Sequence, residues 1–589
     1  MFFKKVLCSP TQTKGYKMTE ISTLQSFRIK YKPELPRSLK KGIKRVAVVE
    51  GDKTDSISHQ DELKSLFPTT YGQSVITFKS GKKPKKLEAK NFGVILSGGQ
   101  APGGHNVITG LYDGLKRINK NNKLFGFLGG PSGIVDGKYI ELDDTLIDSY
   151  RNTGGFDMIG SGRTKLETEE QFMKVWQVCQ NLNISGIVII GGDDSNTNAA
   201  LLAEWLKAKN AGICVVGCPK TIDGDLKNAQ IETSFGFDTA CKTYAGLVGN
   251  IERDALSAKK YWHFVKLMGR SATHVGLEVA LQTHPNITLI SEEVEASEVS
   301  LDALVQSMVD VIVERAEAGK NYGVALIPEG LIEFVPEMKK LITNLNDSMS
   351  LVESSEAFKN AKTDAERFQS VIDHLNQTAP DSAKVFDSLP TLIKAQLLLD
   401  RDPHGNIQVS KIDTEQLLIS MIKAKLEKLR AEDKYHGKFS GQAHFFGYEG
   451  RCAFPSNFDA NYCYALGYNA CALLQSGRTG YISCIKNLTA PTNKWIAGGT
   501  PLTMMMTMEK RHGQFKPVIQ KALVKLDGPV FKKLMDNRSQ WALNDDYQFP
   551  GAIQYYGPIE VTNATTKTLE LEKGKMKQRR WFKRLRLFR

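Results

Sequence analysis

FGVILSGGQAPGGHNVI, residues 92–108, joins an apolar run of strand length to a glycine turn and then to the start of a helix. Gly98 and Gly99 let the backbone come close to a ligand. The helix that opens near His105 directs its free N–H groups and positive dipole end at the same point. We expect an anion there, although a tight turn without a ligand is the alternative for this motif alone.

Outward from this stretch, short β-branched runs alternate with longer amphipathic segments from about residue 44 onward. Strand, helix and strand at this spacing predict an α/β protein with two doubly wound, Rossmann-like domains. The expected strands are 46–49, 92–96, 123–128, 184–190, 213–217, 261–267, 286–290, 322–327 and 444–447, and the clearest helices are 196–209, 238–255 and 301–318.

Two further glycine turns follow apolar strands. IVIIGGDDSNTNAA (187–200) places Asp193 and Asp194 at a strand end, where carboxylates suit Mg²⁺; an N-cap with an acidic loop residue is the alternative. VVGCPKTIDGD (215–225) supplies Lys220 as a cation and Asp223 as a proton acceptor, although a surface Lys–Asp pair would look the same. Phosphate-binding glycines beside carboxylates of this kind indicate phosphoryl chemistry.

Weaker motifs place charged residues at other strand exits, where they suit a phosphorylated, polyhydroxylated substrate. These motifs are GSGRTK (160–165), KLMGRS (266–271), IPEG (327–330) and FGYEGR (446–451). The sequence contains no GxxxxGK[ST] loop, no HRD or DFG kinase signature and no GxGxxG fingerprint. The common nucleotide-binding templates are therefore not matched.

The strand and helix pattern stops at residues 331–440, which hold two of the 50 glycines and are rich in Leu, Lys, Glu and Ala. This composition predicts a helical insertion. The predicted organisation is an N-terminal extension (1–90), a donor domain (91–232 with about 452–545), a sugar-phosphate domain (233–451) containing the insertion, and a C-terminal extension (546–589) with a basic tail.

The formal charge of +14 is concentrated at the chain ends. Residues 1–50 and 573–589 together carry +18, so the intervening residues carry −4. Because the body is mildly acidic, a nucleic-acid partner is unlikely, and the tails are expected to be solvated. No apolar run is long enough for a membrane span, and the first residues do not form a secretory signal, so we expect a cytoplasmic protein.

Taken in order, the motifs SGGQAPG, GGDDS, PKTIDGD, MGR, PEG and YEGR resemble those of the phosphofructokinase family, most closely its long-chain, pyrophosphate-dependent type. The resemblance covers about residues 91–330 and 441–510. It implies the family fold and reversible transfer of phosphate from pyrophosphate to the 1-hydroxyl of fructose 6-phosphate, with Mg²⁺ as cofactor.

The resemblance also implies roles for single residues. Asp223 matches the catalytic base, Asp193 the Mg²⁺ ligand, Gly99 a donor-phosphate contact, and Arg163 an arginine that bridges donor and acceptor. The sugar-phosphate site would comprise Thr221, Ile222, Asp223, Met268, Gly269, Arg270, Glu329, Tyr448, Glu449, Gly450 and Arg451. Lys260 and Tyr261 occupy the place where ATP-dependent relatives contribute an arginine across a subunit interface, so a homo-oligomer is implied, with a dimer favoured.

Donor choice depends on Asp194 and Lys220, where ATP-dependent relatives commonly have glycine. The family interpretation places the Asp194 carboxylate where the α-phosphate of ATP would lie. Two unit charges about 4 Å apart repel by roughly 4 kcal/mol at an effective dielectric near 20, which disfavours ATP. Lys220 would attract the pyrophosphate and take part in catalysis. The alternatives are an ATP-dependent 6-phosphofructokinase and a noncatalytic regulatory subunit, although a regulatory subunit would be expected to lose Asp223 or Arg270.

Overall fold

The computed structural model describes residues 21–81, 88–399, 407–511, 514–552 and 557–558. It divides into residues 33–553 and a separate unit formed by the two chain ends, in which helix α1 (Thr23–Arg28) is described. The basic tail at 573–589 lies outside the described residues. Within the described part of the chain, no helix is both long enough and apolar enough to cross a bilayer.

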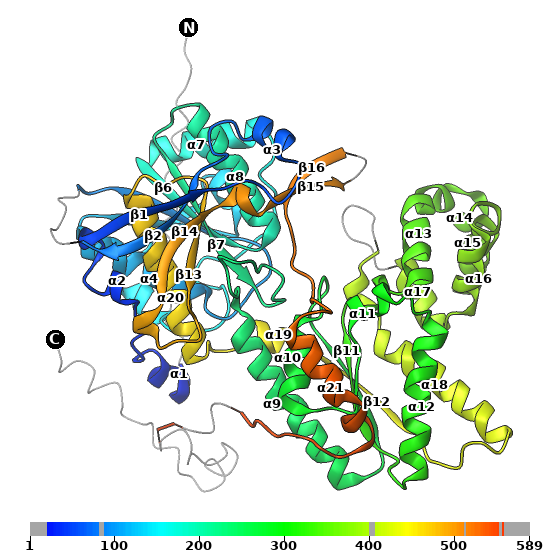
Figure 1. Ribbon diagram of the computed structural model, residues 1–589. Coiled ribbons are helices and arrows are strands. Elements are labelled where there is room, and N and C mark those ends of the chain that lie inside the picture. Colours follow the sequence, from blue (N-terminus) through cyan, green and yellow to red (C-terminus); the bar gives the residue numbers. More distant parts are fainter. Residues whose placement is uncertain (1–20, 82–87, 400–406, 512–513, 553–556, 559–589) are drawn as a thin grey trace, which may run out of the picture. The chain divides into compact units, whose positions relative to one another are not determined.

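A ten-stranded sheet forms the larger part of the 33–553 unit (Figure 1). Its parallel centre runs in the order β13-β7-β6-β3-β4, and antiparallel strands extend both edges. The central strands are β3 (Asn91–Leu96), β4 (Lys123–Phe127), β6 (Ile184–Gly191), β7 (Cys214–Thr221) and β13 (Tyr481–Lys486). The others are β1 (Val46–Lys53), β2 (Ser74–Ser80), β5 (Tyr139–Glu141), β8 (Phe235–Gly236) and β14 (Ile496–Pro501).

Both faces of this sheet are buried. Along β6, Val188 and Ile190 join the core under α4 (Gly104–Ile118) and α20 (Asn457–Gln475), whereas Ile187 and Ile189 join the core under α7 (Glu169–Asn181) and α8 (Asp193–Ala208). Because successive residues of a strand point to opposite faces, this alternation requires helices on each side. The predicted doubly wound arrangement is confirmed.

A second sheet is parallel throughout, in the order β10-β11-β9-β12. Trp262 and Phe264 of β9 face one core, and Val265 and Leu267 face the other. Its strands are β9 (Trp262–Leu267), β10 (Ile287–Thr288), β11 (Gly323–Pro328) and β12 (Gly441–Phe446), and its main helices are α9 (Phe237–Ala258), α10 (His274–Thr283) and α12 (Leu301–Glu317). The expected strand over 286–290 is thus only two residues long.

The predicted helical insertion is also confirmed, because the described part of 331–440 folds into successive helices. Their apolar residues join the core on one face of the second sheet. These helices are α13 (Pro336–Ser354), α14 (Glu356–Asn360), α15 (Asp364–Thr378), α16 (Pro380–Ser388), α17 (Thr391–Leu399) and α18 (Thr414–Ala431). The remaining helices are α2 (Arg37–Lys40), α3 (Gln60–Leu66), α5 (Pro131–Val135), α6 (Asp144–Ser149), α11 (Ser291–Ala296), α19 (Tyr448–Arg451) and α21 (Pro529–Leu543). The domain limits stated above stay a prediction.

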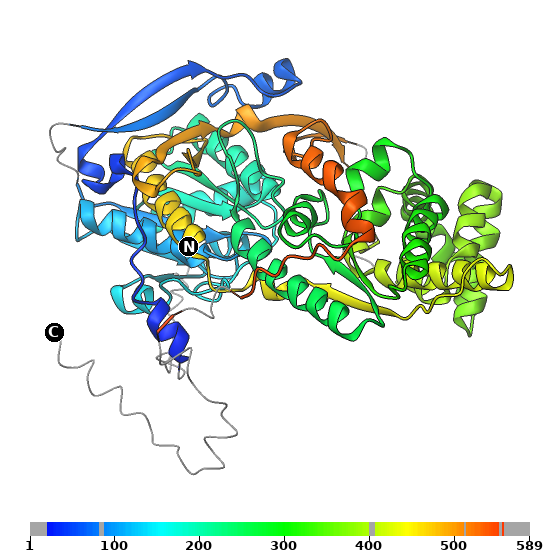
Figure 2. The same cartoon turned by 60° about the horizontal axis from the view of Figure 1, so that its bottom comes forward.

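After β14 the chain forms the antiparallel hairpin of β15 (Met506–Arg511) and β16 (Gln514–Ile519). It then crosses to α21, which packs on α10, α12 and β10 of the second sheet (Figure 2). The segment between β16 and α21 therefore runs from a hairpin that packs on helix α8 of the first sheet to a helix that packs on the second sheet.

Candidate active site

The glycine turn after β3 lies beside Lys220 at the end of β7. Gly98 has a φ of +82°, and its N–H donates to the Gly162 carbonyl oxygen at 2.9 Å. A Cβ atom on Gly98 would lie 3.2 Å from the Lys220 ammonium nitrogen. Only glycine combines this backbone conformation with such a close approach. The turn predicted to bind an anion thus has a lysine directly against it.

Lys220 is 6% exposed, and its surroundings make it a strong anion partner. Burial, together with the charge of Arg451, lowers the pKa of its ammonium group to about 8, although Asp223 and Asp193 partly oppose this shift. The lowered pKa means that this charge is poorly compensated by the protein. A phosphate oxygen at the Gly98 turn would supply the missing compensation.

Asp223 occupies the next loop position, and its backbone N–H donates to Thr221 Oγ1 at 3.1 Å. Burial raises the pKa of the Asp223 carboxyl, whereas the cations Lys521, Lys220 and others around it lower the pKa. Burial also raises the pKa of Asp225 to about 7, with the Asp223 charge acting in the same direction. Asp223 therefore combines partial desolvation with several cations, which is the environment of a proton acceptor.

Asp193 is the first residue of α8, and its Oδ2 lies 3.5 Å from Lys521 Nζ. Asp194 follows it on the same helix end and is exposed. Among the described residues no group of three or more His, Cys, Asp or Glu side chains could enclose a metal. A single carboxylate such as Asp193 can still contribute to a Mg²⁺ site, because Mg²⁺ is usually held by one or two carboxylates together with water and substrate phosphates.

The second sheet places its polar residues at the carboxyl ends of β9 and β11. Glu329 Oε2 accepts a hydrogen bond from the Gly269 N–H at 3.0 Å, which joins the MGR and PEG motifs. A Cβ atom on Gly330 would lie 1.9 Å from the Arg270 carbonyl oxygen, so glycine is needed there. Burial raises the pKa of Glu329. Met268 is buried, and Arg270 is exposed beside this pair.

Arg451 connects the two sheets. It ends α19, its Nε donates to the Gln100 carbonyl oxygen at 3.2 Å, and its guanidinium fills the space where a Gly99 side chain would be. The guanidinium carbon lies 5.6 Å from the centre of the Tyr448 ring. The YEGR motif therefore reaches across to the glycine turn of the first sheet, with Gly450 buried and Glu449 exposed in the same helix.

Most of the predicted residues thus gather at the facing carboxyl ends of the two sheets. Thr221 is the last residue of β7, and Ile222, which follows it, is buried. The charge of Arg163 contributes to the lowered pKa of Lys220. Lys260 and Tyr261 are the exception, because they precede β9 and Met268 follows it. A strand of six residues separates them by about 20 Å from the site of their own chain.

Lys521 was missed by the sequence reasoning, although it lies among these residues. Its ammonium nitrogen is 2.7 Å from Ser271 Oγ and 3.5 Å from Asp193 Oδ2. It lies two residues after the end of the short strand β16. A position at a strand end is also the signal that pointed to Lys220 and the aspartates. No glycine turn accompanies it, so no local motif marks this lysine.

Comparisons with known proteins show which family this chain resembles. The family model described as Phosphofructokinase matches residues 91–474. A protein of Porphyromonas gingivalis named pyrophosphate–fructose 6-phosphate 1-phosphotransferase is 54% identical over 553 residues, covering 94% of this chain and 99% of its own length. A protein of Treponema pallidum (strain Nichols) with the same name is 52% identical over 564 residues, covering 94% and 97%.

Among solved structures, the pyrophosphate-dependent phosphofructokinase of Nitrosospira multiformis aligns with a TM-score of 0.51 at 16% sequence identity. The alignment covers 78% of this chain and 93% of that one. At this identity the likeness concerns the fold, and it agrees with the two doubly wound sheets described above.

Proposed function

Because the chain belongs to the phosphofructokinase family, we propose that it transfers phosphate reversibly from pyrophosphate to the 1-hydroxyl of fructose 6-phosphate, giving fructose 1,6-bisphosphate and phosphate. One observation carries this choice. The Lys220 ammonium group lies against the Gly98 turn, within the charge field of Asp223 and Asp193. A cation at an anion-binding turn next to a carboxylate base is the arrangement that phosphoryl transfer to a hydroxyl needs.

In the proposed reaction, pyrophosphate binds at the turn after β3 and fructose 6-phosphate at the residues after β9, β11 and β12. Asp223 accepts the proton of the sugar's 1-hydroxyl group. The hydroxyl oxygen attacks the terminal phosphorus of pyrophosphate, and inorganic phosphate leaves. Lys220 and Arg163 balance the charge that spreads over the phosphoryl oxygens. Asp193 would hold Mg²⁺, which supplies further charge neutralisation when bound.

Glu329, Gly269 and Arg451 would orient the sugar phosphate. The Gly269–Glu329 hydrogen bond joins two strand ends of the second sheet, and Arg451 reaches the glycine turn of the first sheet. Met268, Arg270, Tyr448, Glu449 and Gly450 complete the proposed sugar site. Lys260 and Tyr261 cannot reach it within one chain, which supports a homo-oligomer in which these residues serve the partner's site. We further propose a dimer in the cytoplasm.

Asp194 is the proposed determinant of donor choice. It lies exposed at the end of α8, one residue after the proposed magnesium ligand. A carboxylate there would repel the α-phosphate of a nucleotide, and pyrophosphate has no such group. Lys220, by contrast, attracts a compact anion. Both side chains therefore favour pyrophosphate over ATP.

The test is a coupled assay of the purified protein with fructose 6-phosphate and Mg²⁺, in which pyrophosphate is compared with ATP. We expect turnover with pyrophosphate, no turnover with ATP, and the reverse reaction with fructose 1,6-bisphosphate and phosphate. Turnover with ATP alone would identify an ATP-dependent 6-phosphofructokinase. Inactivity with both donors would favour the noncatalytic subunit.

A further inference from the structure

The segment that joins β16 to α21 runs through the proposed active site and is held by hydrogen bonds on both sides. On the side of the first sheet, the Ala522 N–H donates to the Asp225 carbonyl oxygen at 2.7 Å. On the side of the second sheet, His274 Nε2 lies 2.8 Å from the Ala522 carbonyl oxygen, and the Val524 N–H donates to Glu292 Oε1 at 3.0 Å. The backbone next to Lys521 is therefore fixed.

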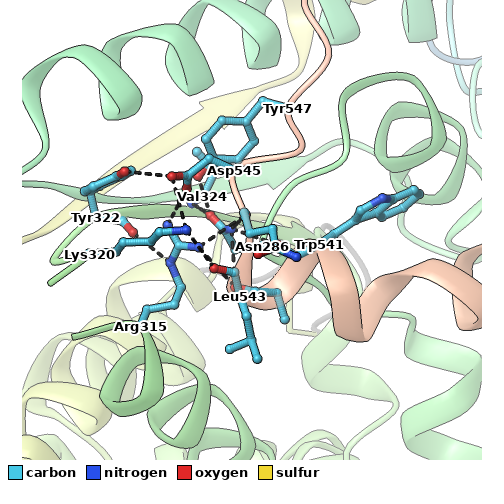
Figure 3. Close-up of polar contacts among 11 residues, drawn as sticks. Asn286, Arg315, Lys320, Tyr322, Val324, Trp541, Leu543, Asp545 and Tyr547 are labelled. Carbon is cyan, nitrogen blue, oxygen red and sulfur yellow. Dashed lines mark hydrogen bonds and ion pairs between the residues drawn. The ribbon is translucent and has the colours of Figure 1, made fainter. Parts of the chain in front are cut away.

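The helix that follows this segment, α21, is anchored at its C-terminal end by a buried arginine (Figure 3). Arg315, on α12, is fully buried; it donates to the Ala542 carbonyl oxygen at 3.3 Å and to Asp545 Oδ1 at 2.8 Å. Asn286 donates to the Trp541 carbonyl oxygen at 2.9 Å. These bonds satisfy carbonyl groups at the end of α21, which a helix leaves without internal partners. The crossing segment is thus tied to the second sheet through α21.

Lys521 extends from this fixed backbone between the two halves of the site. Its ammonium group donates to Ser271 Oγ at 2.7 Å, one residue after Arg270, and lies 3.5 Å from Asp193 Oδ2. The side chain is 32% exposed, so a ligand can reach it. Of the charges that lower the pKa of Asp223, Lys521 is the largest. It therefore lies near the proposed base, the proposed metal ligand and the sugar site together.

We propose that Lys521 is a further catalytic residue, whose ammonium group contacts the transferring phosphoryl group together with Lys220. This inference rests on the proposed function. A phosphoryl group in transfer carries charge on three oxygen atoms, and one lysine cannot contact all of them. Lys220 approaches from the end of β7, whereas Lys521 approaches from the segment after β16. Two cations from different directions would stabilise the charge in both directions of a reversible reaction.

The competing explanation is a purely structural role, in which Lys521 neutralises Asp193 and holds the crossing segment. The two explanations differ in what removal of the charge does. Loss of a structural ion pair lowers the melting temperature and leaves turnover nearly unchanged. Loss of a cation at the phosphoryl group lowers kcat in the folded enzyme. Lys521→Met and Lys521→Gln remove the charge, and the glutamine can still donate to Ser271.

The experiment measures kcat, KM and the melting temperature for the full chain in both reaction directions. We expect both variants to lose at least ~10²-fold in kcat, the usual cost of one donor at a developing charge, with little change in melting temperature. Lys521→Arg should recover at least a tenth of wild-type kcat. Lys525→Met is the matched control, because Lys525 is exposed on the same segment, and it should behave as wild type.

A kcat within about threefold of wild type in either folded, charge-removing variant would overturn the proposal, as would loss of turnover that only follows unfolding. If the wild-type chain used ATP instead of pyrophosphate, the proposed donor would be wrong, yet the same loss of kcat with ATP would still support Lys521. A chain inactive with both donors would overturn both proposals.

Discussion

Lys220 should lose its charge within the pH range of ordinary assays, because burial lowers the pKa of its ammonium group from 10.5 to about 8. The difference corresponds to about 3 kcal/mol in favour of the neutral form. With a pKa of about 8, the protonated fraction is about 0.9 at pH 7 and about 0.1 at pH 9. If the ammonium group binds pyrophosphate, kcat/KM for pyrophosphate should fall about tenfold over this interval.

The perturbation is Lys220→Met, which keeps an unbranched side chain one atom shorter than lysine and removes its charge. We would measure kcat/KM for pyrophosphate at saturating fructose 6-phosphate and Mg²⁺ from pH 6 to pH 9.5, for the wild type and the variant. The ratio of the two values at each pH cancels the titration of pyrophosphate itself and of every group that the two proteins share. We expect the ratio to be nearly constant from pH 6 to pH 7, where the lysine is charged, and to fall about tenfold between pH 7 and pH 9.

The pH at which kcat declines provides a second check. Bound pyrophosphate favours the charged lysine, so it raises the pKa of Lys220 in the complex. The alkaline decline of kcat should therefore lie at higher pH than that of kcat/KM, which reports the free enzyme. A ratio of wild type to variant that stayed constant from pH 6 to pH 9.5 would refute the reasoning, because the decline would then belong to another group.

Three other predictions concern the site and its support. Asp223→Ser should lower kcat at least ~10²-fold with an unchanged melting temperature, because the hydroxyl proton loses its acceptor; near-normal turnover would remove Asp223 from this role. Asp194→Gly should weaken use of pyrophosphate and admit some ATP, as measured by kcat/KM for each donor, and a variant inert with ATP would show that this carboxylate alone does not exclude the nucleotide. Arg315→Met should lower the free energy of unfolding by about 3–5 kcal/mol, because Asp545 and the end of α21 lose a buried partner; denaturant unfolding measures this, and a change under about 1 kcal/mol would contradict the anchoring role.

Local sequence was sufficient for the parallel strands and for the helical insertion. Apolar runs such as 92–96 and 184–190 are buried on both faces, so they stand out without knowledge of their neighbours. The carboxyl ends of parallel strands meet at one sheet edge, and for this reason Asp193, Lys220 and Asp223 could be expected close together. Short or antiparallel strands such as β5, β14 and those of the β15–β16 hairpin carry weaker patterns and were not predicted.

The sequence by itself was sufficient to propose the chemistry of the candidate site: glycine turns for an anion, a lysine, and carboxylates at strand ends. Only the tertiary structure decided which distant residues complete it. Arg451 reaches Gly99 from more than 350 positions along the chain, and Lys521 reaches Asp193 from more than 320. The tertiary structure also decided that Lys260 lies away from the candidate site of its own chain. Such approaches depend on how two sheets pack and how a crossing segment is anchored, and no local pattern of residues records either.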